Sequence, residues 1–287
     1  MIRRTFVATT VAIAFASTAS AAFAAEPLRL KIYNADSNSF GVTSTLVVGP
    51  TEAMVIDAGF TRADALRITA NVLDSGKQLK TIYVSQADPD YYFGVETLKA
   101  YFPQVEVVTT PAVLAKLSAK VAFWGPKMDA NAPKNPVTPK ALEGTTLTVD
   151  GETIEIRGTE GLLAHRPYAW IPSIKAVVGN IAVFGNIHVW TADTQTAAER
   201  NAWVNQLDEM ASLQPTTVVP GHMQPGTTTD ASAIAYTKNY LQTFEKALAT
   251  NKSSAALAGA MNRAFPKVGG AMSLDIGAKV NTGEMKW

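Results

Sequence analysis

Two acidic side chains and a histidine are the residues of this sequence best suited to do chemistry. Asp88 and Asp90 stand one residue apart in the polar loop 84–94, and Pro220-Gly221-His222 follows a late apolar run. Two close carboxylates raise one another's pKa, so such a pair can do acid–base work. With a histidine they also offer ligands to a divalent cation. The simpler interpretation is a turn, because Asp favours turns and Pro89 restricts the residue before it.

The composition narrows the candidate chemistry. The chain has 287 residues, no cysteine and only three histidines, which are His165, His188 and His222. Disulfides, thiolate metal sites and cysteine nucleophiles are therefore excluded. The 25 basic residues nearly balance the 24 acidic ones and are scattered, so no nucleic-acid partner is expected. The sequence also lacks a Gly-x-Ser-x-Gly elbow and a phosphate-binding glycine loop.

The first residues have the pattern of a secretory signal peptide. Arg3-Arg4 precedes the apolar run 6–17, and Ala22-Phe23-Ala24 is a small-x-small cleavage site. A membrane span needs about 20 apolar residues, so we expect cleavage of residues 1–24 rather than anchoring, and no span afterwards. The product should be periplasmic or secreted, and the arginine pair leaves both Sec and twin-arginine export open.

Strands and helices must position the candidate side chains. In the first half, apolar patterns predict strands at 28–33, 44–48, 53–57, 81–85 and 105–108 and helices at 61–75, 95–101 and 111–122. In the second half they predict strands at 147–149, 153–156, 168–171, 176–178, 181–184 and 217–219 and helices after the capping box Thr196–Glu199 and from Asp230 to Ala249. The proline-rich segment 126–139 should be a loop, and the Gly-rich tail 267–287 carries no clear pattern.

This order of elements predicts an α/β fold, with residues 25–287 as one domain. Buried strands that alternate with helices form layered architectures. In each half of the chain, a run of strands is followed by alternating strands and helices. We therefore expect an αββα sandwich, in which two mixed sheets pack face to face with helices outside. Loops beyond the strand ends should carry the functional side chains.

The order of the polar loops resembles the metallo-β-lactamase superfamily. An Asp-x-Gly at Asp57 follows an early strand, an apolar strand runs into the loop 84–94, and Pro220-Gly221-His222 comes late. The resemblance covers nearly all of residues 28–250. Two further segments are similar to secreted bacterial members, namely 170–173 and 188–194. The resemblance implies the same sandwich fold and a hydrolase that makes hydroxide on one or two zinc ions.

The family's metal motif has changed in this chain. The motif is His-x-His-x-Asp-His, and the four matching positions hold Gln86, Asp88, Asp90 and Tyr91. His222 matches the family's last histidine. The middle histidine should fall before Tyr168, where only His165 or, less plausibly, Glu160 could serve, and Gly179-Asn180 stands in place of the bridging aspartate. The resemblance therefore implies a degenerate site that cannot hold zinc in the family manner.

Two kinds of site remain open. In the first, Asp88, Asp90 and His222 hold one divalent metal (manganese, iron or zinc) whose bound water is the nucleophile, and oxygen ligands favour harder ions than zinc. In this site Tyr91 or His165 stabilises the developing oxyanion. The predicted catalytic residues are therefore Asp90, Tyr91 and His165. In the second, no metal is bound and the pocket holds a small molecule without turnover. Both share the pocket residues Gln86, Asp88, Asn180, His188 and Trp124.

Three functions follow from these alternatives: a hydrolase of small esters, lactones or amides; a metal-free small-molecule-binding protein; or a scaffold for partner contacts. The loop keeps its length, Asp90 and Gly94, so its ligands are substituted rather than deleted. That pattern favours a retained pocket over a scaffold. A β-lactamase activity does not follow, because fold does not set substrate.

Plain structural roles compete for several of these residues. Asp57 is expected to tie loops together by hydrogen bonds. His188 lies in an apolar run and should be a satisfied wall residue, and Asp193 should cap a helix. Trp124 is either core or part of an apolar substrate mouth.

Overall fold

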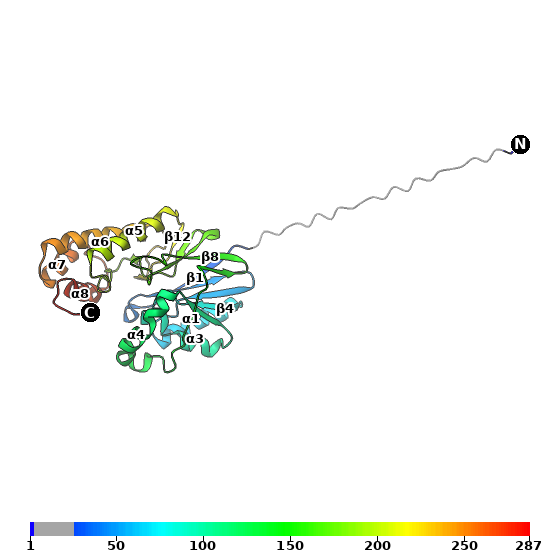
Figure 1. The fold of residues 1–287 in the computed structure, drawn as a ribbon, viewed down its shortest axis with the longest axis horizontal. Coiled ribbons are helices and arrows are strands. Elements are labelled where there is room, and N and C mark those ends of the chain that lie inside the picture. Colours follow the sequence, from blue (N-terminus) through cyan, green and yellow to red (C-terminus); the bar gives the residue numbers. More distant parts are fainter. Residues whose placement is uncertain (3–25) are drawn as a thin grey trace.

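Two mixed β-sheets lie between two groups of helices in the computed structural model of the chain (Figure 1). The structure describes residues 1–2 and 26–287, so the predicted signal peptide lies almost wholly outside the described residues. Within the described part of the chain, no helix is both long and apolar enough to cross a membrane.

The first sheet follows the chain order from edge to edge. Its strands are β1 (Arg29–Asn34), β2 (Thr43–Val48), β3 (Glu52–Ile56), β4 (Gln78–Tyr83), β5 (Glu106–Thr109) and β6 (Lys140–Ala141). The pairs β1·β2 and β2·β3 are antiparallel, and the later pairs are parallel because helices connect them. These helices are α1 (Arg62–Ser75), α2 (Pro89–Tyr92), α3 (Val95–Tyr101) and α4 (Pro111–Met128).

The second sheet has the order β12-β10-β9-β8-β7. Its strands are β7 (Thr146–Val149), β8 (Glu152–Arg157), β9 (Tyr168–Ile171), β10 (Ala176–Val178) and β12 (Thr217–Val218). A short parallel pair, β11 (Phe184–Gly185) and β13 (His222–Met223), lies beside the site described below. The helices of this half are α5 (Ala197–Ser212), α6 (Ser232–Thr250), α7 (Ser254–Ala264) and α8 (Ala271–Asn281).

The three largest apolar clusters of the described residues hold these layers together. One joins the first sheet to its helices and includes Ile68 and Ile82, and a second lies between the sheets around Ile56 and Val178. The third packs α5 to α8 around Trp203. In Figure 1 the helices α1, α3 and α4 lie on one side of the sheets and α5 to α8 on the other. The predicted αββα sandwich is thereby confirmed.

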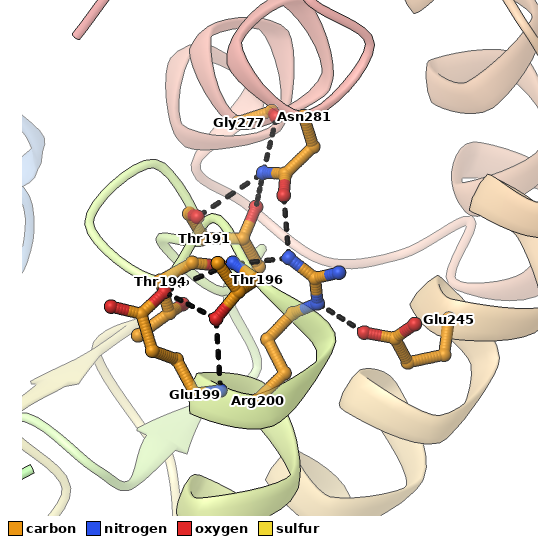
Figure 2. A network of polar contacts seen from close by, with 8 residues as sticks. All are labelled: Thr191, Thr194, Thr196, Glu199, Arg200, Glu245, Gly277 and Asn281. Carbon is orange, nitrogen blue, oxygen red and sulfur yellow. Dashed lines mark hydrogen bonds and ion pairs between the residues drawn. The ribbon is translucent and has the colours of Figure 1, made fainter. Parts of the chain in front are cut away.

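Polar contacts fasten the C-terminal helix to the rest of the second half (Figure 2). Arg200 on α5 donates to the Thr194 carbonyl oxygen at 2.8 Å and to Asn281 Oδ1 on α8 at 2.6 Å, and it ion-pairs with Glu245 on α6. Asn281 also donates to the Thr191 carbonyl oxygen at 3.1 Å. The loop 191–196 is therefore held between α5 and α8.

The structure differs from the predicted elements at several positions: α2, α7, β6 and β13 were not predicted, and three further differences follow. Of the predicted strand 181–184, only Phe184 lies in a strand, β11; the Val183 amide instead donates to Asn180 Oδ1, three residues earlier in the chain. Helix α4 continues to Met128, with Pro126 in its last turn. The patternless tail contains α8, which begins after Gly270 in the left-handed region (φ 74°).

Candidate functional site

A cavity opens above the two candidate side chains Asp90 and His222. Its empty volume is about 590 Å³, the mouth included. Asp88, Asp90 and His222 contribute polar groups, and most of the lining is apolar. The aromatic side chains are supplied by loops, by α4, by β11 and by the C-terminal end, namely Phe40, Phe60, Trp124, Phe184, Trp190 and Trp287. An apolar cavity with few polar groups is the usual form of a small-molecule site.

Asp90 and His222 face each other at the inner end of this cavity. Asp90 Oδ2 lies 3.4 Å from His222 Nε2, and the other ring nitrogen, Nδ1, lies 3.1 Å from the Phe40 carbonyl oxygen. Because a carbonyl oxygen can only accept, Nδ1 carries the proton and Nε2 presents a lone pair to Asp90. Burial raises the pKa of Asp90 well above its usual value and lowers the pKa of His222 to about 4. Burial therefore disfavours the charged form of both side chains.

Asp88 is held by a lysine rather than by its neighbours in the loop. Lys120 Nζ on α4 lies 2.7 Å from Asp88 Oδ1 and 3.2 Å from Asp193 Oδ1. Burial alone lowers the pKa of Lys120, but the two carboxylates outweigh it and the net shift is upward. Burial raises the pKa of Asp193, but Lys120 and other partners outweigh burial and hold it below its usual value. Lys120 is thus a charged ammonium between two acidic groups.

The predicted metal ligands do not form a metal site in this arrangement. Across residues 1–2 and 26–287, no three His, Cys, Asp or Glu side chains gather closely enough to hold a metal ion. Asp90 and His222 are adjacent, but Asp88 is paired with Lys120, and the ammonium already supplies positive charge there. The donor set therefore does not fit a divalent ion held by Asp88, Asp90 and His222.

The two predicted oxyanion groups lie away from the apolar cavity. Tyr91 is fully buried and its hydroxyl donates to the Asn180 carbonyl oxygen at 3.2 Å. Burial and the nearby Asp90 raise the pKa of Tyr91 well above its usual value. His165 lines a neighbouring polar recess instead. Neither side chain lines the cavity beside Asp90.

The predicted pocket residues separate into lining residues and supporting residues. Asp88 and Trp124 line the cavity. Gln86 donates to the Pro167 carbonyl oxygen at 2.9 Å, and Asn180 donates to the Val219 carbonyl oxygen at 3.0 Å. His188 is placed between Tyr240 and Asn262, at 2.9 and 3.2 Å, as a satisfied wall histidine would be. The structure thus places Gln86, Asn180 and His188 behind the cavity wall, because each side chain is used to hold a loop.

Two further residues show how local hydrogen bonding shapes the site. Asp57, in the left-handed region (φ 67°), accepts from the Ser85 amide and hydroxyl, both at 2.7 Å, and so ties two loops together as expected. Asp193 does not cap a helix. It accepts from Trp190 Nε1 at 2.7 Å and Trp287 Nε1 at 3.0 Å, and Thr196 caps α5 instead.

Sequence reasoning missed Lys120, Arg166 and Trp287. Lys116, Lys120 and Trp124 follow one another at intervals of four residues on α4, so they share a face, and this spacing was a usable signal. Trp287 contacts Asp193 from the far end of the chain, and no local pattern predicts such a contact.

Replacing Lys120 with Met is expected to lower the free energy of unfolding by about 2 kcal/mol at about pH 8, since Asp88 and Asp193 lose their shared cation while remaining partly hydrated. The loss should shrink as the pH falls and the carboxylates become protonated. Urea unfolding at several pH values measures it, and Lys120→Arg should restore most of the stability. A loss that does not change with pH would contradict the ion-pair role.

Comparison with known proteins agrees with the fold. A model of the Metallo-beta-lactamase superfamily matches residues 38–222, which include the loop 84–94 and His222. A metallo-beta-lactamase family protein from Thermus thermophilus has a TM-score of 0.64 and 16% identity, covering 89% of this chain and 91% of that chain. A metallo-beta-lactamase from Pontibacter korlensis has a TM-score of 0.51 and 15% identity, with 77% and 97% covered. Among curated proteins, no match is found.

The matched segment is well over half of the chain and includes strands β2 to β12 and most of the residues that line the cavity. Helices α6 to α8 and Trp287 follow the matched segment. By its sequence and its fold, the chain belongs to the metallo-β-lactamase superfamily.

Proposed function

We propose that this chain is a metal-independent member of the superfamily that binds a small molecule in the cavity above Asp90 and His222. One observation carries the proposal: Lys120 Nζ lies 2.7 Å from Asp88 Oδ1, so a side chain of the protein neutralises the carboxylate that a metal would need. The loop and the cavity are retained while the ligand set is altered. Because residues 1–24 have the pattern of a secretory signal peptide, we also propose that binding takes place outside the cytoplasm.

The cavity walls indicate what kind of molecule would bind. Trp190 and Trp287 meet edge to face with ring centroids 5.3 Å apart, and Trp287 lies 6.2 Å from Trp124. Phe40 packs near Trp190 at 6.4 Å on the same cavity. Aromatic walls favour a planar or bulky apolar body. The proposed ligand therefore has an apolar, preferably aromatic, body.

A second candidate is hydrolysis of a small ester, lactone or amide. It is favoured by the Asp90–His222 pair, in which a neutral imidazole presents its Nε2 lone pair at the inner end of a shielded cavity. With water between the two side chains, Nε2 can accept its proton, although burial lowers the pKa of His222 to about 4 and makes this imidazole a weaker base than usual. This candidate needs no metal either, and turnover distinguishes it from binding.

Elemental analysis of the purified mature protein, before and after loading with zinc, manganese and iron, tests metal independence. We expect far less than one metal ion per chain in each case. About one ion per chain that disappears in the Asp90→Ala/His222→Ala variant would overturn the proposal and restore the predicted ligands.

A thermal-shift screen of aromatic compounds tests ligand binding and should find a stabilising ligand. Recovery of this compound unchanged supports binding without turnover, whereas a cleaved product supports the hydrolase.

A further inference from the structure

A polar recess adjoins the apolar cavity. Asp88, Lys120, Ile181 and Asp193 line both spaces, so these side chains form the boundary that the two spaces share. The remaining lining residues of the recess are Ala87, Lys116, His165 and Arg166. The recess is therefore lined by three cationic side chains, a histidine and two carboxylates.

Arg166 is the unusual member of this group. Its side chain is buried, with the residue only 4% exposed, and its guanidinium carbon lies 4.3 Å from the centre of the Trp203 ring. Nη2 makes one long contact with the Ile181 carbonyl oxygen at 3.5 Å, whereas Nη1 has no hydrogen-bond partner among the described residues. A buried guanidinium group without an acceptor is strongly unfavourable. A ligand that supplies an acceptor would remove this penalty.

The charges of the recess do not cancel. Lys120 contacts Asp88 and Asp193 directly, and these three side chains carry one net negative charge when both acids are ionised. Arg166 and Lys116 form no ion pair within the described part of the chain, so positive charge remains. His165 adds no charge at neutral pH, because burial, Lys116 and Arg166 lower its pKa to about 4. A neutral imidazole still offers a hydrogen-bond donor beside the two cations.

We propose that this recess binds the anionic head group of the small molecule whose apolar body fills the cavity. Arg166 and Lys116 supply the charge and His165 a hydrogen bond, while Ile181 marks the junction between head group and body. The class of ligand is an aromatic or apolar acid with one anionic head, either a carboxylate or a phosphate monoester. This inference rests on the proposed function, because it assigns the second half of the same ligand.

Titration calorimetry with matched probes tests the proposal. The probes are 2-naphthoate, its neutral counterpart 2-naphthamide, and 2-naphthyl phosphate, each added to the mature protein. A hydrogen bond to a charged group is worth about tenfold or more in affinity. We expect 2-naphthoate or 2-naphthyl phosphate to bind about tenfold more tightly than 2-naphthamide, and the tighter of the two identifies the head group.

Variants locate the effect in the recess. Arg166→Gln should reduce binding of the anionic probe about tenfold and leave 2-naphthamide unchanged. Because Arg166 packs on Trp203, Lys116→Gln on the exposed face of α4 provides a second variant, with an expected loss of a few-fold. Lys134→Gln is the control, since this exposed lysine lines neither space.

The outcomes separate the two proposals. Equal binding of the acid and the amide, unaffected by Lys116→Gln, would overturn the anionic head group and leave the apolar cavity as a binding site. Absence of binding by all three probes would overturn both. A tenfold preference that both Arg166→Gln and Lys134→Gln reduce equally would place the effect in general surface charge and overturn the recess.

Discussion

Replacing Arg200 with Met is expected to lower the free energy of unfolding by about 3–5 kcal/mol, the range found when one partner of a buried ion pair is removed. Arg200 is only 3% exposed and is the centre of the network in Figure 2. Without it, the Thr194 carbonyl oxygen and Asn281 Oδ1 lose a charged donor, and Glu245 loses its cation. Unsatisfied buried acceptors of this kind account for most of the loss.

A second ion pair between the same two helices provides the control. Lys238 on α6 pairs with Asp208 on α5, but these side chains are 34% and 52% exposed. Exposed pairs contribute about 0–1 kcal/mol, so Lys238→Met should change stability very little. Chemical denaturation of both variants measures the difference. Equal losses of unfolding free energy in the two variants would show that an ion pair between α5 and α6, rather than its burial, explains the contribution of Arg200.

The Arg200 network also bears on the cavity, because it holds the loop that carries Asp193. That loop is fixed to α8 through Asn281, and the chain after α8 brings Trp287 to Asp193 at 3.0 Å. The Arg200→Met variant should therefore lose ligand-induced stabilisation as well as intrinsic stability. The wall of the cavity and the C-terminal helix are parts of one structure.

Much of the fold followed from local chemistry. The Asp150-Gly151 turn joins β7 to β8 in an antiparallel hairpin, and the Thr196–Glu199 capping box begins α5. Such signals are local, because the side chains act on their own backbone. Helices α7 and α8 gave no comparable signal. They are rich in small residues, and packing of Met261 and Leu274 in the core around α6 stabilises them.

The site was harder to predict because its contacts join distant segments. The loop 84–94 and His222 could be identified, and Asp90 and His222 do come together. The role of Asp88 depends on Lys120, which lies on a helix whose apolar pattern describes only its buried face. Arg166 is buried against Trp203, although an arginine in a loop is normally assigned to solvent. The polar residues of the loop 84–94 could be identified in the sequence, whereas the lysine that pairs with Asp88 could be identified only in the fold.

Asp57→Asn is expected to make the protein more stable than the wild type at alkaline pH. Asp57 is 2% exposed, and burial raises its pKa from 3.8 to about 7, although hydrogen bonds from Ser85 oppose the rise. A carboxyl whose pKa is higher in the folded state stabilises the fold while protonated. This stabilisation is complete at pH values below the pKa of the carboxyl in the unfolded chain. It is lost as the pH rises through the pKa of the carboxyl in the folded protein. Between about pH 4 and pH 8 the wild type should lose on the order of 4 kcal/mol from this group alone.

Asparagine should keep the geometry while removing the titration. It tolerates the left-handed backbone at this position (φ 67°), and its amide can accept from the Ser85 amide and donate to the Ser85 hydroxyl oxygen. The difference in unfolding free energy between variant and wild type, from urea titrations, should therefore grow steadily from acid to alkaline pH.

Asp64→Asn is the control with the opposite sign. Burial raises the Asp64 pKa, but hydrogen bonds from Ser39, Tyr33 and Thr61 hold it below its usual value. The stability that its carboxylate contributes is lost as the pH falls, so the deficit of this variant should shrink in acid. Parallel pH profiles for wild type and Asp57→Asn would mean that Asp57 ionises in the fold without penalty, and that water reaches the junction between the two loops.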